Sequence, residues 1–276
     1  MIPQAIFADG ATVPALGQGT WRFGEGQRTR AEEAASLRLG IDLGMTLIDT
    51  AEMYAEGGAE EVVAEAIAGQ RERVFLVSKV YPHNATRRGT QAACERSLKR
   101  LRTERIDLYL LHWLGAAPLT ETVAAFQALV AAGKIARWGV SNLDVDDLEG
   151  LPDLGGCATD QVLYNLEHRG PEFDLLPFCA KVWMPVMAYS PVGQGGRLLR
   201  SPALLRVAAR HGATPAQIAI AWTLRSPGVI SIPKAGDLAH VRENAAAASI
   251  RLAPIDLVEL DAAFPTPRRK QGLAML

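Results

Sequence analysis

Short apolar runs alternate with longer amphipathic segments along most of the chain. The apolar runs predict strands and the amphipathic segments predict helices. The predicted strands are 14–20, 46–49, 74–80, 106–112, 135–142, 157–161, 182–190 and 229–234. The predicted helices are 30–44, 59–69, 87–101, 121–133, 144–149, 173–181, 201–212 and 237–248. Continuous apolar strands that alternate with amphipathic helices indicate a parallel sheet covered by helices.

The number and order of these elements favour one architecture. Residues 6–16 carry Asp9-Gly10 between two short apolar runs, which predicts a small hairpin ahead of the first strand. Eight strands in a chain of 276 residues without a Pro/Ser-rich linker predict one domain over 1–276, an α/β fold of the (β/α)8 TIM-barrel type with a short N-terminal β-hairpin. A doubly wound open sheet is the competing fold. It usually carries G-x-G-x-x-G after its first strand, and this motif does not occur in the sequence.

Composition excludes several classes of partner. The formal net charge of −1 gives no basic surface for nucleic acid. The three cysteines are widely spaced and form no CxxC pair, which fits free thiols in a reducing compartment. The N-terminus has no signal-peptide pattern, and no apolar run approaches the ~18 residues of a membrane span. We therefore expect a cytoplasmic protein without nucleic-acid or membrane partners.

Polar residues follow the apolar runs at seven successive predicted strand ends. They are Asp49, Lys79, His112, Ser141 with Asn142, Asp160 with Gln161, Tyr189 with Ser190, and Lys234. A single Asp after a strand is more often an N-cap or a turn residue. However, all these ends would open onto the same face of a barrel, which is the face where barrel enzymes carry their chemistry. The opposite charges of Asp49 and Lys79 therefore favour a shared pocket over independent turns.

Three of these polar residues, together with Tyr54, suit proton transfer to a carbonyl oxygen. The Tyr54 phenol has an ordinary pKa of about 10, which a neighbouring ammonium such as Lys79 lowers. Asp49 can supply the counter-charge that a buried lysine needs. His112 can donate a hydrogen bond that holds the carbonyl oxygen near the phenol. The five histidines are scattered, and neither G-x-S-x-G nor H-E-x-x-H occurs, so a metal site or an activated nucleophile has little support.

Over essentially its whole length the sequence resembles the aldo-keto reductases, which are NAD(P)H-dependent carbonyl reductases built on a (β/α)8 barrel. The resemblance lies in LGQGTW (16–21), LIDTAEMYAEGGAEEVV (47–63), LVSKV (76–80), DLYLLHW (107–113), WGVSN (138–142), DQVLYN (160–165), MAYSPV (187–192) and IPKAGDLAHVREN (232–244). In order and approximate spacing these motifs are highly specific. The residues within these motifs are most similar to those of the bacterial branch that includes methylglyoxal-type reductases.

The resemblance implies a role for each matching residue. It makes Tyr54 the general acid, Lys79 the residue that tunes it, Asp49 the partner of that lysine and His112 the residue that orients the carbonyl. The cofactor-binding residues that it implies are Gly19, Thr20, Trp21, Asp49, Ser141, Asn142, Gln161, Tyr189, Ser190, Pro191, Val192, Lys234, Ala235, His240, Glu243 and Asn244. The implied substrate-binding residues are Trp21, Tyr54, His112 and Trp113.

The chain departs from the family pattern where the adenosine 2′-phosphate would bind. Lys234 is present, but Ala235 stands where many members have a hydroxyl. His240 stands where many members have an arginine, whose charged fork histidine cannot reproduce. The resemblance thus implies NADPH as cofactor, with NADH also possible.

Loop lengths bear on the substrate. The loop 113–121 and the tail 264–276 are short, which predicts a shallow, open pocket for small aldehydes, dicarbonyls or ketones. The basic run 268–270 in this tail is predicted to be solvated.

The first hypothesis is therefore a monomeric reductase of small carbonyl compounds. A nicotinamide-cofactor-binding redox sensor or scaffold subunit with little catalysis is the alternative from another class, and a barrel enzyme with unrelated chemistry, such as an isomerase, is a third. The complete set of Asp49, Tyr54, Lys79 and His112 favours the enzyme.

Overall fold

The computed structural model describes residues 2–276 and begins with the predicted hairpin. Strands β1 (Gln4–Ile6) and β2 (Thr12–Pro14) pair in antiparallel fashion. The turn between them contains Gly10, whose φ of +83° is one that residues with a side chain rarely adopt. The hairpin is thus confirmed, with a first strand that starts two residues earlier than the predicted segment.

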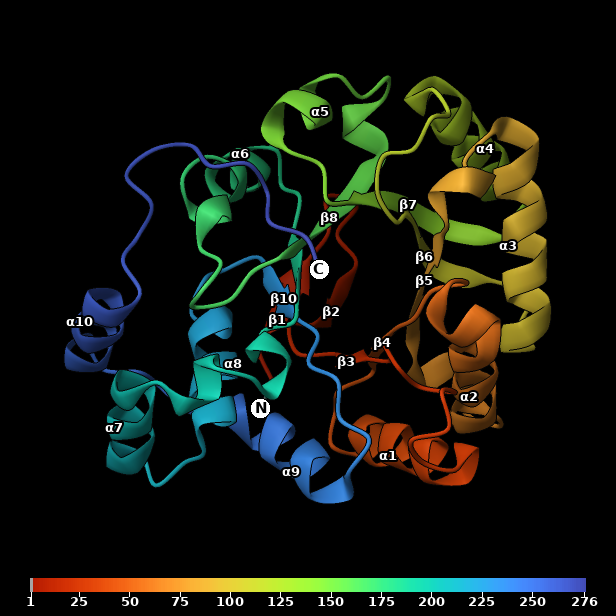
Figure 1. The fold of residues 1–276 in the computed structure, drawn as a ribbon. Helices are drawn as coiled ribbons and strands as arrows, with labels where there is room; N and C mark the ends of the chain where they lie inside the picture. The colour runs from red at the N-terminus through yellow and green to blue at the C-terminus, as the bar shows by residue number, and fades with distance from the viewer. Residues whose placement is uncertain (1) are drawn as a thin grey trace.

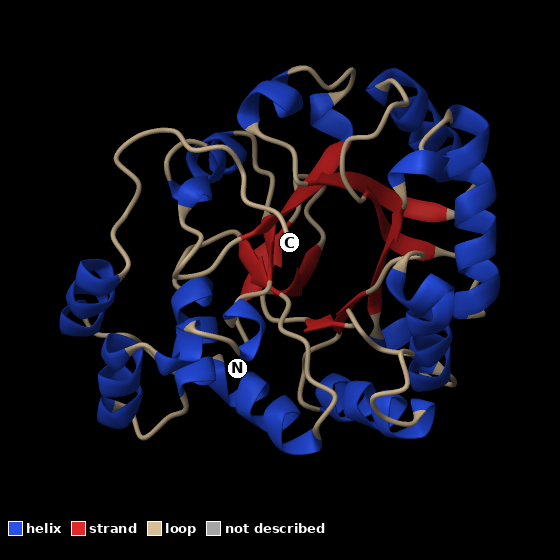
Figure 2. Cartoon of the chain, in the orientation of Figure 1, coloured by secondary structure: helices blue, strands red, loops and turns tan. Residues whose placement is uncertain are grey.

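The strands that follow form a closed parallel barrel within the described residues. They are β3 (Gln18–Gly19), β4 (Leu47–Asp49), β5 (Phe75–Val80), β6 (Ile106–Leu111), β7 (Ile135–Ser141), β8 (Cys157–Leu163), β9 (Val186–Tyr189) and β10 (Val229–Ser231). Each strand pairs in parallel with its neighbour in the chain. Parallel bridges from Leu16 to Ser231 and from Gly19 to Lys234 join the first strand to the last. Figure 2 shows the resulting ring of strands inside a ring of helices, so the predicted TIM barrel is confirmed.

Helices follow the strands in the alternating order that the sequence predicts. They are α1 (Arg30–Asp42), α2 (Gly58–Ile67), α3 (Arg87–Leu101), α4 (Leu119–Ala131), α5 (Val145–Glu149), α6 (Leu175–Lys181), α7 (Pro202–Arg210), α8 (Pro215–Leu224), α9 (Leu238–Ala247) and α10 (Pro254–Ala263). α8 and α10 have no counterpart among the predicted elements. α8 buries every residue from 218 to 223 and therefore shows no periodic polar face.

Side chains of the barrel strands alternate between the barrel interior and the surrounding helices. In β4, Leu47 faces the interior cluster and Ile48 faces the helices, which places Asp49 on the interior side. In β5, Val77 faces the interior, so Lys79 does as well. The period of two thus carries both charged residues onto the inside of the barrel at the ends of their strands.

The hairpin closes one end of the barrel. Ala5, Phe7 and Val13 pack in the same cluster as Leu108 and Met187 of the barrel interior. Burying large apolar side chains of this kind contributes roughly 1.5–3 kcal/mol each. The open end is therefore the opposite one, at the carboxyl ends of the strands. Within residues 2–276, no helix is long and apolar enough to cross a membrane.

Candidate active site

A cavity of about 700 Å³ opens at the carboxyl ends of the barrel strands. The predicted site residues that line it are Gly19, Trp21, Asp49, Tyr54, His112, Trp113, Ser141, Asn142, Gln161, Tyr189, Ser190, Pro191, Val192, Lys234, His240, Glu243 and Asn244. Three others lie outside the lining. Thr20 is buried and donates a hydrogen bond to the carbonyl of Asp49 at 2.9 Å, and Ala235 packs against an apolar cluster. Lys79 is fully buried behind the cavity wall.

All hydrogen-bond donors of the Lys79 ammonium are used. Its Nζ atom donates to Oδ2 of Asp49 at 2.8 Å, to the carbonyl of Thr50 at 2.9 Å and to the phenol oxygen of Tyr54 at 3.2 Å. An ammonium group has three protons and no lone pair, so the Tyr54 oxygen accepts this bond. The O–H of Tyr54 is thereby left to donate elsewhere, and both the ammonium and the phenol are fixed in orientation.

A strained loop brings Tyr54 to Lys79. Ala55 and Glu56 adopt left-handed backbone conformations with φ of 50° and 54°, and Gly57 follows with φ of 92°. Such conformations cost of order 1 kcal/mol or more for residues with a side chain. This local cost turns the chain back after β4 and directs the phenol into the cavity.

Burial governs the protonation of the phenol and the ammonium. Burial raises the pKa of Tyr54, and the opposing effect of the Lys79 ammonium does not overcome it. The sequence-based expectation that Lys79 brings the pKa of this phenol below its usual value is therefore wrong for the protein alone. Burial by itself lowers the pKa of Lys79, but the charge of Asp49 and the Tyr54 oxygen raise it above its ordinary value. A protonated phenol beside a charged ammonium follows.

His112 is a neutral imidazole at the cavity wall. Its ring meets the Tyr54 ring edge-on, with 5.6 Å between the centroids. Burial, together with the charge of Lys79, lowers the pKa of His112 to about 2. Its Nδ1 atom is buried and has no hydrogen-bond partner within residues 2–276.

The residues predicted to hold the nicotinamide carboxamide form a connected group. Ser141 on β7 donates to the carbonyl of Gln161 on β8 at 2.7 Å. The Asn142 side chain donates to the His112 carbonyl at 3.1 Å and accepts from the Tyr189 phenol at 3.0 Å. Gln161 donates to Oδ1 of Asp49 at 2.7 Å. The group therefore reaches both His112 and the carboxylate that holds Lys79.

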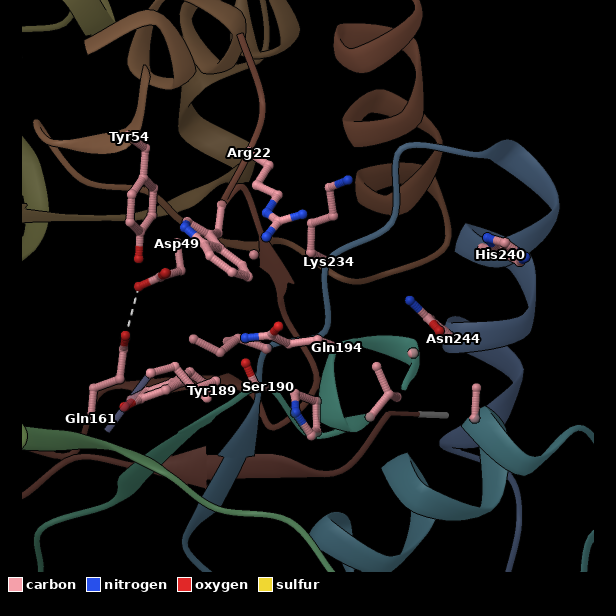
Figure 3. A pocket seen from close by; sticks show the side chains of 18 of the residues that line it. Arg22, Asp49, Tyr54, Gln161, Tyr189, Ser190, Gln194, Lys234, His240 and Asn244 are labelled. Carbon is pink, nitrogen blue, oxygen red and sulfur yellow. Dashed lines mark hydrogen bonds between the residues drawn. The ribbon is translucent and has the colours of Figure 1, made fainter. Parts of the chain in front are cut away.

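The cavity extends from this group to a second end, which is lined by Lys234, His240, Glu243 and Asn244. Figure 3 shows Tyr54, Asp49 and Gln161 at one side and Asn244 and His240 at the other. Lys234 is exposed where it lines the cavity, and partial loss of solvent around its ammonium lowers its pKa against the opposing charge of Glu33. No group of three potential His, Cys, Asp or Glu metal ligands occurs among residues 2–276.

Comparison with known proteins agrees with this geometry. The model of the aldo/keto reductase family matches residues 15–264. The chain belongs to the aldo/keto reductase family. The resemblance found in the sequence is thereby confirmed, and the chain is an oxidoreductase.

Individual members of the family match along nearly their full length. Methylglyoxal reductase YeaE of Escherichia coli is 53% identical over 98% of both chains. Glyoxal reductase of Bacillus subtilis is 31% identical over 92% of this chain and 90% of its own. A crystal structure of an aldo-keto reductase from Klebsiella pneumoniae in complex with NADPH superposes with a TM-score of 0.97 at 51% identity and covers 100% of both chains.

Several cavity residues of this aldo/keto reductase escaped the sequence analysis. They are Arg22, Gln27, Leu199, Thr214, Pro215, Ala216, Met275 and Leu276. Thr214 and Gln217 form a capping box with Pro215 at the first helical position, so this sequence signal could have predicted the start of α8. Nothing in the sequence marks Met275 or Leu276, because their position depends on the path of the tail across the barrel.

Backbone strain concentrates at the same cavity. Arg22, Asn142, Ser190 and Gln194 all line it with positive φ angles, of 67°, 62°, 49° and 57°. Strained residues persist only where surrounding structure enforces them, and they cluster at functional sites. Their position here supports the assignment of this cavity as the active site.

Proposed function

We propose that this chain reduces small aldehydes, dicarbonyls or ketones, such as methylglyoxal, to alcohols with NADPH and with Tyr54 as general acid. The observation that carries the proposal is the buried chain from Asp49 through Lys79 to Tyr54, whose phenol opens on the cavity beside neutral His112. The activities named for the relatives from E. coli and B. subtilis, and the NADPH of the Klebsiella complex, support it.

The cavity suits a dinucleotide. Its length places amide and hydroxyl groups at one end and a cationic group at the other. We propose that Ser141, Asn142 and Gln161 hold the carboxamide, that Tyr189 packs under the nicotinamide and that Lys234 binds the 2′-phosphate. The other proposed cofactor contacts are Gly19, Thr20, Trp21, Asp49, Ser190, Pro191, Val192, Ala235, His240, Glu243 and Asn244. When bound, NADPH supplies the hydride for reduction of the carbonyl carbon.

The protein's own part is to hold and protonate the carbonyl oxygen. The Tyr54 phenol donates its proton as negative charge develops on that oxygen. Lys79 already donates to the phenol oxygen at 3.2 Å, so its charge stabilises the phenolate as it forms. Because the pKa of His112 is near 2, it is a neutral donor, and a proton on Nε2 points into the cavity while Nδ1 stays buried. Trp21 and Trp113 complete the proposed substrate wall.

Purified protein with NADPH and a panel of carbonyl compounds tests this function. The panel contains methylglyoxal, glyceraldehyde and a nitrobenzaldehyde, and the readout is loss of NADPH absorbance. Turnover with at least one small carbonyl compound is expected. Tight NADPH binding without turnover of any compound would contradict the proposal and favour a cofactor-binding sensor or scaffold.

We further propose a monomeric, cytoplasmic protein of one domain over residues 1–276. All three cysteines are free and buried, which is consistent with a reducing compartment. Burial raises the pKa of Cys94 to about 12, so this thiol stays protonated and unreactive at neutral pH. Light scattering after size exclusion should give a mass near 29.7 kDa. A mass of twice this value would contradict the monomer.

A further inference from the structure

The tail 264–276 crosses the open end of the barrel. In Figure 1 it leaves α10, passes α6 and ends over the strands of the barrel. Leu273 packs against the main hydrophobic core, and Met275 and Leu276 line the active-site cavity. The short tail therefore supplies part of the cavity wall.

One lysine ties this tail to the rest of the barrel mouth. The Lys270 ammonium lies 3.5 Å from Asp144, 3.5 Å from Asp146 and 3.3 Å from Asp174. Asp144 caps the start of α5, which follows β7, and Asp174 precedes α6, which follows β8. The run 268–270 is exposed, as the sequence predicts, and Lys270 in addition makes ion pairs to two separate loops.

Lys270 is the cation that pairs with these three aspartates. In the described part of the chain, neither Asp144, Asp146 nor Asp174 has an ion pair with any other residue. Three carboxylates this close repel one another unless a cation lies between them. Exposed ion pairs contribute little one at a time, but three carboxylates around one ammonium form a network that favours this position of the ammonium. Arg269, the neighbouring residue, is exposed and makes no ion pair in this same set of residues.

The anchored residues face the proposed reaction site. Tyr189 lines the same cavity as Met275 and Leu276, and burial raises the pKa of its phenol to about 12. Trp21 and Trp113 line the same cavity from two other loops. With Met275, these residues give the cavity apolar walls from three separate parts of the chain.

We propose that Lys270 is a positioning residue for substrate specificity. Its ion pairs with the three aspartates hold Met275 and Leu276 in place as an apolar wall of the carbonyl pocket. The wall lowers KM for carbonyl compounds that carry a large apolar group, and a compound with only a methyl group gains little from it. This inference rests on the proposed reductase function and adds to it a preference within the substrate class.

The test compares methylglyoxal with phenylglyoxal, which differ by a methyl against a phenyl group on the same dicarbonyl. Steady-state rates are measured at saturating NADPH for the full chain. In Lys270→Met we expect KM for phenylglyoxal to rise about fivefold with kcat nearly unchanged, and KM for methylglyoxal to change less than about twofold. Lys270→Arg should retain the wild-type values, because it keeps the cation.

Two further variants separate this effect from a loss of folding. Arg269→Met, which removes a neighbouring charge without an ion pair, should behave as wild type. Asp174→Asn should raise KM for phenylglyoxal as Lys270→Met does, and the double variant should add nothing further. Asp174 makes no side-chain cap to α6, so its replacement leaves that helix start intact.

Each other result would overturn the inference. A substrate wall positioned by Lys270 would be excluded if KM changed equally for the two glyoxals. It would also be excluded if KM for phenylglyoxal were unchanged in both Lys270→Met and Asp174→Asn, or if these variants bound NADPH more tightly. If wild-type protein reduces neither compound nor any other carbonyl, the proposed function itself fails, and this is seen before any variant is measured.

Discussion

Gln161 Nε2 donates a hydrogen bond to Oδ1 of Asp49 at 2.7 Å. Oδ2 of the same carboxylate accepts from Lys79 at 2.8 Å, so one buried side chain joins a proposed cofactor residue to the lysine that donates to Tyr54, the proposed proton donor. Asp49 is 2% exposed, and each of its two carboxylate oxygens accepts a hydrogen bond from a neighbouring side chain. A continuous chain of hydrogen bonds therefore connects the proposed cofactor residue Gln161 with the Lys79 ammonium.

Gln161→Glu tests this coupling. It places a second carboxylate against Asp49, and the repulsion is expected to disturb the pairing with Lys79. We expect kcat to fall about tenfold or more, which corresponds to ~1.4 kcal/mol, together with weaker NADPH binding. Gln161→Met is the control of similar size without charge, and it should weaken NADPH binding with a smaller loss of kcat. Equal kcat in the two variants would contradict the coupling.

Tyr54→Phe removes the proposed acid and leaves the ring. The phenyl ring preserves packing against His112, while the proton donor is lost. We expect kcat for methylglyoxal to fall by about 10²–10⁴-fold, with the Kd for NADPH measured by fluorescence within about twofold of wild type. Tyr81→Phe, outside the cavity lining, is the matched control and should keep wild-type turnover, because the phenyl ring keeps its packing against Trp113. Wild-type rates in Tyr54→Phe would contradict the proposal that Tyr54 is the general acid.

Much of this site was predictable because a barrel converts strand order into proximity. Asp49, Lys79 and His112 each end an apolar run, and the alternation of the strands brings them to one face. The sequence could not show the sign of the Tyr54 pKa shift, because burial and the Lys79 charge act in opposite directions and their sizes depend on the packing.

Contacts between distant segments were the other unpredictable part. The ion pairs of Lys270 join residues that are about one hundred positions apart in the chain, and no local pattern encodes such a contact. α8 was missed for a different reason: a helix buried on nearly all sides lacks the polar stripe by which amphipathic helices are found.

The pH profile follows from the protonation of Tyr54 and His112. Reduction requires a protonated phenol, and burial raises the pKa of Tyr54 above its usual value of about 10. His112, with a pKa of about 2, is already neutral in weak acid. We expect kcat for reduction to be flat from about pH 6 to about pH 9 and to fall only as pH rises toward the pKa of the phenol. Measurement of kcat over this pH range checks the prediction. An inflection of the kcat profile near pH 6.5 would mean that His112 titrates as an ordinary histidine.

His240→Arg addresses cofactor choice. His240 lines the polar end of the cavity on α9, and arginine at this position would add a charged fork for a phosphate near Lys234. A charge-assisted hydrogen bond of about 1.5 kcal/mol corresponds to roughly tenfold, so the ratio of kcat/KM for NADPH over NADH should rise about tenfold. Arg242→Ala, two residues along the same helix and outside the described cavity lining, serves as the control and should leave the ratio unchanged. An unaltered ratio in His240→Arg would show that position 240 does not contact the 2′-phosphate, and the preference for NADPH would then have to come from Lys234 and the loop that precedes α9.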